Sequence, residues 1–328
     1  MNNNHDFTEG EILRPMLTFR GPVLLAMFLQ SLYGAVDLMV VGKFAEAADA
    51  SGVNTGSQVM MMLTFVVTSF SMAVTILMGQ HIGEKSPEKA GDVIGTGIIM
   101  FAIMAIAMTF AGVIFAPEIA AGLKAPRDAF NQTVSYIRVC SSGFVFIIAY
   151  NVMSGVFRGV GDSVMPLISV TIASVFNIIG DLFFVKGMGM GAKGAAIATV
   201  MAQVISVILS MFIISKRKMP FILTKDKLRI DKSIAKRIFS LGTPLLLQDI
   251  LVSVSFLFLL AITNSRGVIV SAGVGIAEKL CGFIMLVPSA FSQSVSAFVA
   301  QNVGAKRMDR ANRALKYALV VSVCVGLV

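Results

Sequence analysis

Runs of apolar residues long enough to cross a lipid bilayer recur along the whole chain. A transmembrane helix needs about 20 such residues, and only helices and closed barrels satisfy their backbone hydrogen bonds inside lipid. Hydrophobic residues make up 56% of the 328 residues and charged residues only 14%, too little charge to cover a soluble protein of this length. We therefore predict an all-α polytopic membrane protein. The predicted spans lie at roughly 15–41, 51–79, 92–116, 131–157, 164–185, 194–215, 238–263 and 270–300, with a ninth beginning near 312.

Lys and Arg residues gather in alternate connections between these spans. The densest group lies in 216–237, between the sixth and seventh predicted spans, and others lie near Lys85, Arg158 and Lys306. Basic residues mark the cytoplasmic side of a membrane protein, so we expect a multi-pass protein of the cell membrane with a cytoplasmic N-terminus. The net charge of +9 then follows from topology, and no nucleic-acid partner is expected. The basic loop could also contact anionic lipid head groups.

One sequence motif occurs twice. Gly79-Gln-His-Ile-Gly-Glu-Lys85 reappears as Ala300-Gln-Asn-Val-Gly-Ala-Lys306, with further matches at the same offset. An even number of predicted spans separates the copies, so both halves enter the membrane in the same direction. Such parallel repeats are typical of transporters, and we predict two six-helix lobes related as parallel repeats, the second incomplete. About eight and a half spans are present, whereas the full symmetry requires about twelve.

The repeat divides the chain into three parts. We predict an N-terminal six-helix lobe over 1–215, a basic cytoplasmic inter-lobe loop over 216–237, and a partial C-terminal lobe over 238–328. By this symmetry the second lobe lacks its last spans, so we expect the chain to be C-terminally truncated. Substrate and coupling sites of such proteins lie near the membrane midplane, between or within the lobes.

Two carboxylates lie inside predicted spans. Asp37 is near the end of the first span, and Asp181 near the end of the fifth, four residues after Asn177 and therefore on the same helix face. An ionisable group within a span costs at least a few kcal/mol and usually serves an ion, proton or substrate path. The competing interpretations are an interfacial Asp37 and a helix–helix hydrogen bond for Asp181. Because the repeat counterpart of Asp37 is Phe258, a shared structural need is disfavoured and function is favoured.

Between the fourth and fifth spans the chain reads Arg158-Gly-Val-Gly-Asp-Ser-Val-Met-Pro166. Together with the twice-occurring motif, Asp37 and Asn177-x-x-x-Asp181, this stretch resembles the multidrug and toxic compound extrusion (MATE) family over essentially the whole chain. The resemblance implies a secondary active antiporter that exports organic cations or amphipathic drugs by alternating access. We expect the Arg158 loop to be a cytoplasmic hinge, with Arg158 at the membrane edge and Asp162 capping the next helix.

The resemblance also implies a coupling site in the N-terminal lobe. The family's first-span carboxylate matches Asp37, its fifth-span amide and carboxylate match Asn177 and Asp181, a fourth-span tyrosine matches Tyr136, and a sixth-span hydroxyl matches Thr199. Oxygen ligands of this kind suit a hard cation such as Na⁺. They equally suit a proton, because two close carboxylates in a low dielectric cannot both be ionised. The choice between Na⁺ and H⁺ stays open, and no cofactor or structural metal is expected.

One branch of the family carries a coupling glutamate in the seventh span. Here that region reads Pro244-Leu-Leu-Leu-Gln-Asp-Ile-Leu-Val252, with an apolar residue at the matching position and Asp249 nearby but out of register. The resemblance is therefore to branches that couple through the N-terminal lobe. Gln30, Gln248 and Asp249 lie within spans and are candidates for the substrate cleft. The 21 Met and 24 Phe suit lipophilic cations, although most such residues pack helices together.

Other functional classes fit the residues less well. A lipid-linked precursor flippase of the same superfamily is the closest alternative, but it would need several basic residues in the cleft, and the charges at membrane depth are mainly acidic. An enzyme would need a nucleophile–base or metal arrangement, and the cysteines and histidines have no metal-binding spacing. A channel is disfavoured by the two-lobe repeat. We expect a monomer that binds small amphipathic molecules and contacts membrane lipids.

Overall fold

The computed structural model describes residues 7–217, 219–264 and 268–326, and within these ranges helices are joined by short turns and loops, without a strand. The predicted all-α fold is confirmed. The helices are α1 (Leu13–Phe44), α2 (Ala47–Gly83), α3 (Pro87–Ile114), α4 (Ala116–Gly122), η1 (Arg127–Ala129), α5 (Phe130–Ser142), α6 (Phe144–Gly159), α7 (Val164–Asp181), η2 (Leu182–Gly187), α8 (Gly191–Lys216), η3 (Lys225–Lys227), α9 (Lys232–Asn264), α10 (Val268–Gly304) and α11 (Met308–Gly326).

Among the described residues, 7 helices are long and apolar enough to cross a membrane, or 8 spans if the bent pair α5–α6 is one span. These correspond to the first eight predicted spans. The predicted ninth span falls in α11, whose first half carries Asp309, Arg310, Arg313 and Lys316. Because of these charges, only the later part of α11 is continuously apolar.

The fourth span differs from the prediction of one continuous helix over 131–157. It is broken at Gly143 into α5 and α6, which are bent by 53°. A Cβ atom on Gly143 would collide with the Val200 side chain of α8, so glycine lets α8 approach the bend. The fifth span is also irregular, because the π-helical turn η2 follows Asp181 directly. Such turns are rare and often accompany functional sites.

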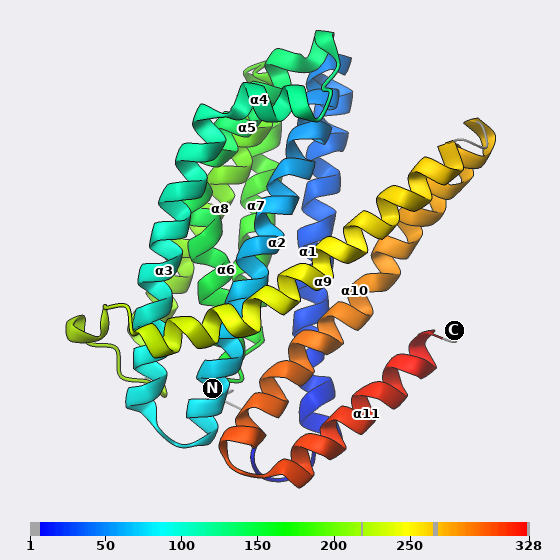
Figure 1. Ribbon diagram of the computed structural model, residues 1–328. Coiled ribbons are helices and arrows are strands. Elements are labelled where there is room, and N and C mark those ends of the chain that lie inside the picture. The colour runs from blue at the N-terminus through cyan, green and yellow to red at the C-terminus, as the bar shows by residue number, and fades with distance from the viewer. Residues whose placement is uncertain (1–6, 218, 265–267, 327–328) are drawn as a thin grey trace.

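The helices form a V whose arms meet at the lower end of the molecule as drawn in Figure 1. The first arm is the bundle α1–α8, and α9 and α10 diverge from it towards the upper right. At the lower end α9 packs against α2, while α10 packs against both α2 and α1. The first helix of each half, α1 or α9, therefore packs against a helix of the other half.

The two copies of the repeated motif pack against each other at this lower end. A Cβ atom on Gly83 of α2 would collide with the backbone carbonyl of Gln301 of α10, and one on Gly304 would collide with the carbonyl of Gln80. A Cβ on Gly79 would lie 3.0 Å from the Ala300 Cβ atom. Glycine thus permits a backbone-to-backbone approach that any other residue would prevent.

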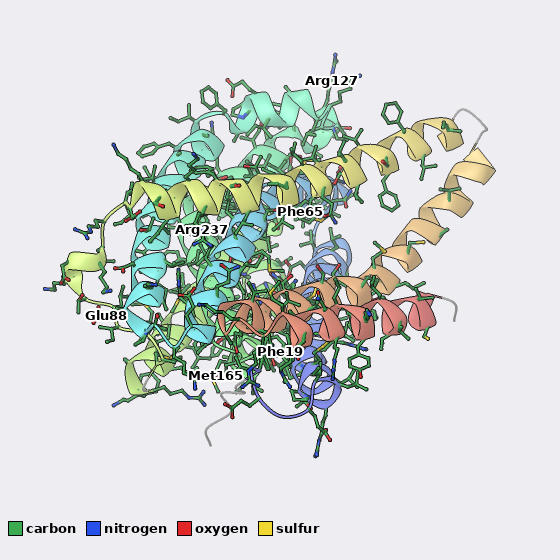
Figure 2. All side chains as sticks on the ribbon, turned by 60° about the horizontal axis from the view of Figure 1, so that its bottom comes forward. Phe19, Phe65, Glu88, Arg127, Met165 and Arg237 are labelled. Carbon is green, nitrogen blue, oxygen red and sulfur yellow. The ribbon has the colours of Figure 1, made fainter. Side chains whose placement is uncertain are left out.

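The segment before α1 joins the two halves at the same end. Phe7 is buried between Phe19 of α1 and Phe298 of α10, with ring centroids 5.3 and 5.1 Å away. The Phe7 carbonyl accepts hydrogen bonds from Asn302 Nδ2 at 3.0 Å and from Arg310 Nη2 at 3.2 Å. Figure 2, which brings this end forward, labels Phe19 beneath α10 and α11.

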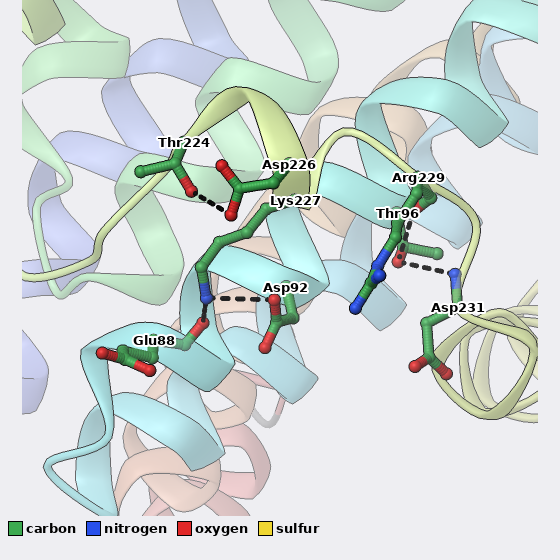
Figure 3. A network of polar contacts seen from close by, with 8 residues as sticks. All are labelled: Glu88, Asp92, Thr96, Thr224, Asp226, Lys227, Arg229 and Asp231. Carbon is green, nitrogen blue, oxygen red and sulfur yellow. Dashed lines mark hydrogen bonds and ion pairs between the residues drawn. The ribbon is translucent and has the colours of Figure 1, made fainter.

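The connection between α8 and α9 lies along α3 (Figure 3). Lys227 Nζ donates to the Glu88 carbonyl at 2.6 Å and pairs with Asp92 at 3.0 Å. Thr96 Oγ1 donates to the Arg229 carbonyl at 3.2 Å and accepts from the Asp231 amide at 3.3 Å. The basic loop therefore packs against α3 of the first bundle.

Candidate functional site

Four of the five predicted coupling residues lie together inside the first bundle. Asp37 of α1, Asn177 and Asp181 of α7, and Thr199 of α8 meet side by side, and the Asp37 carboxyl touches the other three. Thr199 Oγ1 donates to Asp37 Oδ2 at 3.1 Å. Asp37 is 4% exposed, and Asn177 and Asp181 have no exposed surface. The arrangement places two carboxyl groups in contact in a medium of low dielectric.

Most polar atoms of this cluster lack a hydrogen-bond partner among the described residues. These atoms are one oxygen of Asp37, both carboxyl oxygens of Asp181 and both amide atoms of Asn177. Buried polar atoms are normally paired, because leaving one unpaired costs about 1–3 kcal/mol. Two carboxyl groups can also share a hydrogen bond only if one carries a proton. The donor set therefore fits a proton or a hard cation bound through oxygen ligands.

Tyr136, the fifth predicted residue, lies beside this cluster. It is 3% exposed on α5, and its ring packs so closely on α2 that a Cβ at Gly56 would collide with it. No hydrogen bond joins Tyr136 to Asp37 in the described part of the chain. The sequence analysis missed two neighbours, Tyr33 and Gln203. Gln203 Nε2 donates to the Tyr33 hydroxyl at 3.4 Å. The available signal was spacing, since each lies one helical turn from Asp37 or Thr199.

A cavity of about 890 Å³ lies next to the cluster, between the arms of the V. Asp37, Tyr136 and Thr199 line it, whereas Asn177 and Asp181 lie behind Asp37 and do not. The three cleft candidates from the sequence also line it. They are Gln30 of α1 and Gln248 and Asp249 of α9. Both arms therefore contribute to one cavity, and Asp37 connects that cavity to the buried carboxyl of Asp181.

Asp249 links the two arms through a hydrogen bond across the cavity wall. Ser69 Oγ of α2 donates to Asp249 Oδ2 at 3.2 Å. The remaining lining is mixed: methionines and Phe65 alternate with hydroxyl and amide side chains. Flexible thioethers and polar groups of both kinds suit binding of varied amphipathic molecules.

The loop between α6 and α7 contains two residues that the sequence singled out, Arg158 and Asp162. Arg158, expected at the membrane edge, lines the cavity from the last turn of α6. Asp162 does cap the following helix, since its Oδ1 accepts from the amides of Val164 and Met165 at 3.0 and 3.1 Å. Its Oδ2 also pairs with Arg217 Nη1, at the end of α8, at 3.0 Å.

Comparison with known proteins agrees with this fold. The model of the MatE family matches residues 22–183 and 244–328, which together make up most of the chain. The chain belongs to the MatE family. The resemblance seen in the sequence is thereby confirmed, and this MatE chain is a multi-pass membrane protein from a family of multidrug efflux transporters rather than an enzyme.

Named relatives of the MatE chain include multidrug resistance and export proteins of Bacillus and Staphylococcus. It is similar to the probable multidrug resistance protein YoeA of Bacillus subtilis, with 26% identity over 97% of this chain and 70% of the relative. It is also similar to the multidrug export protein MepA of Staphylococcus saprophyticus, with 23% identity over 90% of this chain and 66% of the relative. The chain thus spans about two thirds of the length of these relatives.

Solved structures share the fold of the MatE chain. A MATE transporter in complex with MaD3S superimposes with a TM-score of 0.92 at 20% identity, over 100% of this chain and 74% of that chain. A MOP superfamily transporter from Pyrococcus furiosus superimposes with a TM-score of 0.91, over 100% of this chain and 72% of that chain. At this level of identity the likeness establishes the fold alone, which is that of two-lobed transporters.

Proposed function

We propose that the protein is a secondary active antiporter that exports organic cations and other amphipathic drugs in exchange for Na⁺ or H⁺. The observation that carries the proposal is the contact of Asp37 with Asp181, two buried carboxyls whose remaining oxygens lack partners. An ion or proton relieves the repulsion between them and satisfies these oxygens. Binding there is therefore linked to the packing of α1, α7 and α8.

Coupling follows because Asp37 belongs to the ion site and to the cavity wall at once. When the coupling ion occupies the carboxyl pair, Asp37 no longer offers a free negative charge to a cationic drug in the cavity. Drug and ion then compete for one carboxylate, so that binding of either favours release of the other. The competition couples drug to ion because the affinity of the site for either one is lower when the other is bound.

The charges of the cavity disfavour the flippase alternative. Its described lining contains the carboxylates Asp37 and Asp249 and a single basic side chain, Arg158. A lipid-linked pyrophosphate carries several negative charges and would need several basic contacts. The acidic balance therefore supports cationic amphiphiles as the main substrates.

Alternating access is the movement that we propose for the two arms. The contact of α2 with α10 closes the lower end, while the arms diverge at the other end. The N-terminal end of α1 lies at the closed end. With the N-terminus on the cytoplasmic side of the cell membrane, the open end of this state faces the outside. A monomer surrounded by lipid suffices, since each arm supplies its own part of the cavity.

Transport in vesicles tests the proposal. Efflux of the fluorescent cation ethidium is measured under an imposed Na⁺ gradient and, separately, under an imposed pH gradient. We expect Asp37→Asn and Asp181→Asn each to lower gradient-driven efflux at least about tenfold, because one neutral amide cannot replace a carboxylate at this site. Asp128→Asn, an exposed site outside the cluster, is the matched control. Near-normal efflux in both cluster variants would exclude the coupling role.

A further inference from the structure

Arg158 is the one basic side chain among the described residues that line the cavity. It is half-buried in the last turn of α6, beside Gly159, whose carbonyl accepts a hydrogen bond from Gln301 Nε2 at 2.9 Å. Since Gln301 belongs to the packed ends of α2 and α10, Arg158 lies by the closed end of the cavity. A guanidinium that is half-buried among other side chains normally needs partners for its donors.

The Arg158 guanidinium has no carboxylate partner. Within the described chain, no Asp or Glu oxygen lies within 4.0 Å of it. Its Nη1 donates to the Ser154 hydroxyl at 2.6 Å, while its Nε is buried and unpaired. Guanidinium donors are arranged in a planar fork that matches carboxylate or phosphate oxygens. The donors that Ser154 leaves free can therefore receive an anionic group.

A second donor lies on the same face of α6. Tyr150, Ser154 and Arg158 follow one another at four-residue spacing, and all three line the cavity. Tyr150 and Ser154 are each 6% exposed, so an anion at this stripe would be shielded from water. Shielding strengthens a charge-assisted hydrogen bond. The carboxylates of the cavity lie elsewhere: Asp249 is on α9 with its oxygen bonded to Ser69.

We propose that Arg158, with Tyr150, forms a subsite for the anionic group of an amphipathic substrate. The inference rests on the proposed function and narrows its substrate class to include zwitterionic amphiphiles, in which a carboxylate or phosphate binds Arg158 and a separate cationic group faces Asp37 or Asp249. The negative group could belong to a drug or to the head group of an anionic lipid, since both present the same oxygens to the guanidinium.

Two dyes that differ by one charge test the subsite. Rhodamine B is a zwitterion with a free carboxylate, and its methyl ester is a cation with the same chromophore. Fluorescence anisotropy of each dye is measured with purified protein in phosphatidylcholine nanodiscs, for the wild type, Arg158→Gln and Arg158→Lys. Arg138→Gln, which removes the same charge from an exposed position on α5, is the control. A parallel series containing phosphatidylglycerol reports competition by lipid.

We expect Arg158→Gln to weaken binding of rhodamine B about tenfold, the usual size of one charge-assisted hydrogen bond, and to change binding of the ester less than about twofold. Arg158→Lys should keep part of the preference, and the control should keep all of it. Competition by phosphatidylglycerol that Arg158→Gln abolishes would support the subsite and assign its anion to lipid. Equal losses for both dyes, no loss for either, or no binding of rhodamine B by the wild type would overturn the proposal.

This measurement is separate from transport. If rhodamine B binds through Arg158 but neither a Na⁺ nor a pH gradient drives efflux of any dye, the subsite stands and the antiport proposal fails. If ethidium efflux depends on Asp37 and Asp181 but Arg158→Gln changes the binding of both rhodamine dyes equally, antiport stands and the subsite fails.

Discussion

Gly83 of α2 lies against the backbone carbonyl of Gln301 of α10, with no room for a side chain between them. The repeat-related pair, Gly304 and Gln80, makes the same contact in the opposite sense. Each half of the protein therefore offers a glycine to a carbonyl of the other half. Two identical contacts about one pseudo-symmetry axis can form and break together, as expected of a gate between two lobes.

Gly83→Ala is expected to open this end of the molecule. The added methyl group would meet the Gln301 carbonyl, so α2 and α10 must separate or distort, and Gly304→Ala should act alike. The distance between spin labels at Glu88→Cys and Arg313→Cys, with the exposed Cys281 and Cys324 replaced by serine, should shift to longer values. Gly282→Ala is the control, because its Cβ would meet nothing within 4 Å. An unchanged distance distribution would refute the gate.

Thr199→Val is expected to change coupling-ion binding without preventing folding. Valine has nearly the shape of threonine but cannot donate to Asp37 Oδ2. If Na⁺ is the coupling ion, its half-saturating concentration should rise about tenfold, because the Thr199 oxygen is lost as a ligand. If H⁺ is the coupling ion, the half-saturating proton concentration should fall instead, because the lost hydrogen bond stabilised the ionised Asp37 carboxylate. Thr199→Ser, which keeps the hydroxyl, should stay near the wild type. If valine and serine behave alike, the Thr199 hydroxyl is not a part of the ion site.

Asp162 is expected to stabilise the α6–α7 loop in two separable ways. Asp162→Ala removes both the cap on α7 and the pair with Arg217, and should cost at least about 1–2 kcal/mol. Asp162→Asn keeps a capping oxygen and should cost less. A double-mutant cycle with Arg217→Gln, followed by thermal unfolding of the purified protein, isolates the ion pair. Equal melting temperatures for the alanine and asparagine variants would show that the cap contributes nothing.

Docking of the inter-lobe loop on α3 is expected to protect it from proteolysis. A Cβ on Gly91 or Gly95 would collide with the carbonyls of Ile222 and Lys227, so alanine at either position should release the loop. Trypsin should then cut after the loop lysines and arginines several times faster than in the wild type. Gly21→Ala, whose Cβ would meet nothing within 4 Å, should leave the rate unchanged. Equal cleavage rates in all variants would mean that the loop is already accessible.

The spans were predictable because hydropathy is a local property. A run of about 20 apolar residues satisfies its backbone only as a helix, whatever its neighbours are. The intramembrane carboxylates and the four-residue spacing of Asn177 and Asp181 were visible for the same reason. The break at Gly143 was not, because it reflects the approach of Val200 from another helix.

The repeat could be found in the sequence, but the contact between its two copies could not. Matching Gly79–Lys85 with Ala300–Lys306 predicted two related halves; that the copies pack on each other depends on how α2 and α10 cross. The cavity-facing position of Arg158 was hidden for a similar reason, since a basic residue near a helix end commonly reaches towards the interface. Here the last turn of α6 faces the other arm, and the guanidinium lines the cavity.

The sequence alone determined the class of protein, the approximate spans, the duplicated plan and the residue types of the candidate site, because apolar run length, repeats and charges within apolar runs are set by the order of the residues. Only the tertiary structure decided that Asp37 joins the cavity to Asp181, that glycines close one end, and that Arg158 faces inward. These relationships join residues far apart in the chain, and the packing of whole helix faces sets them.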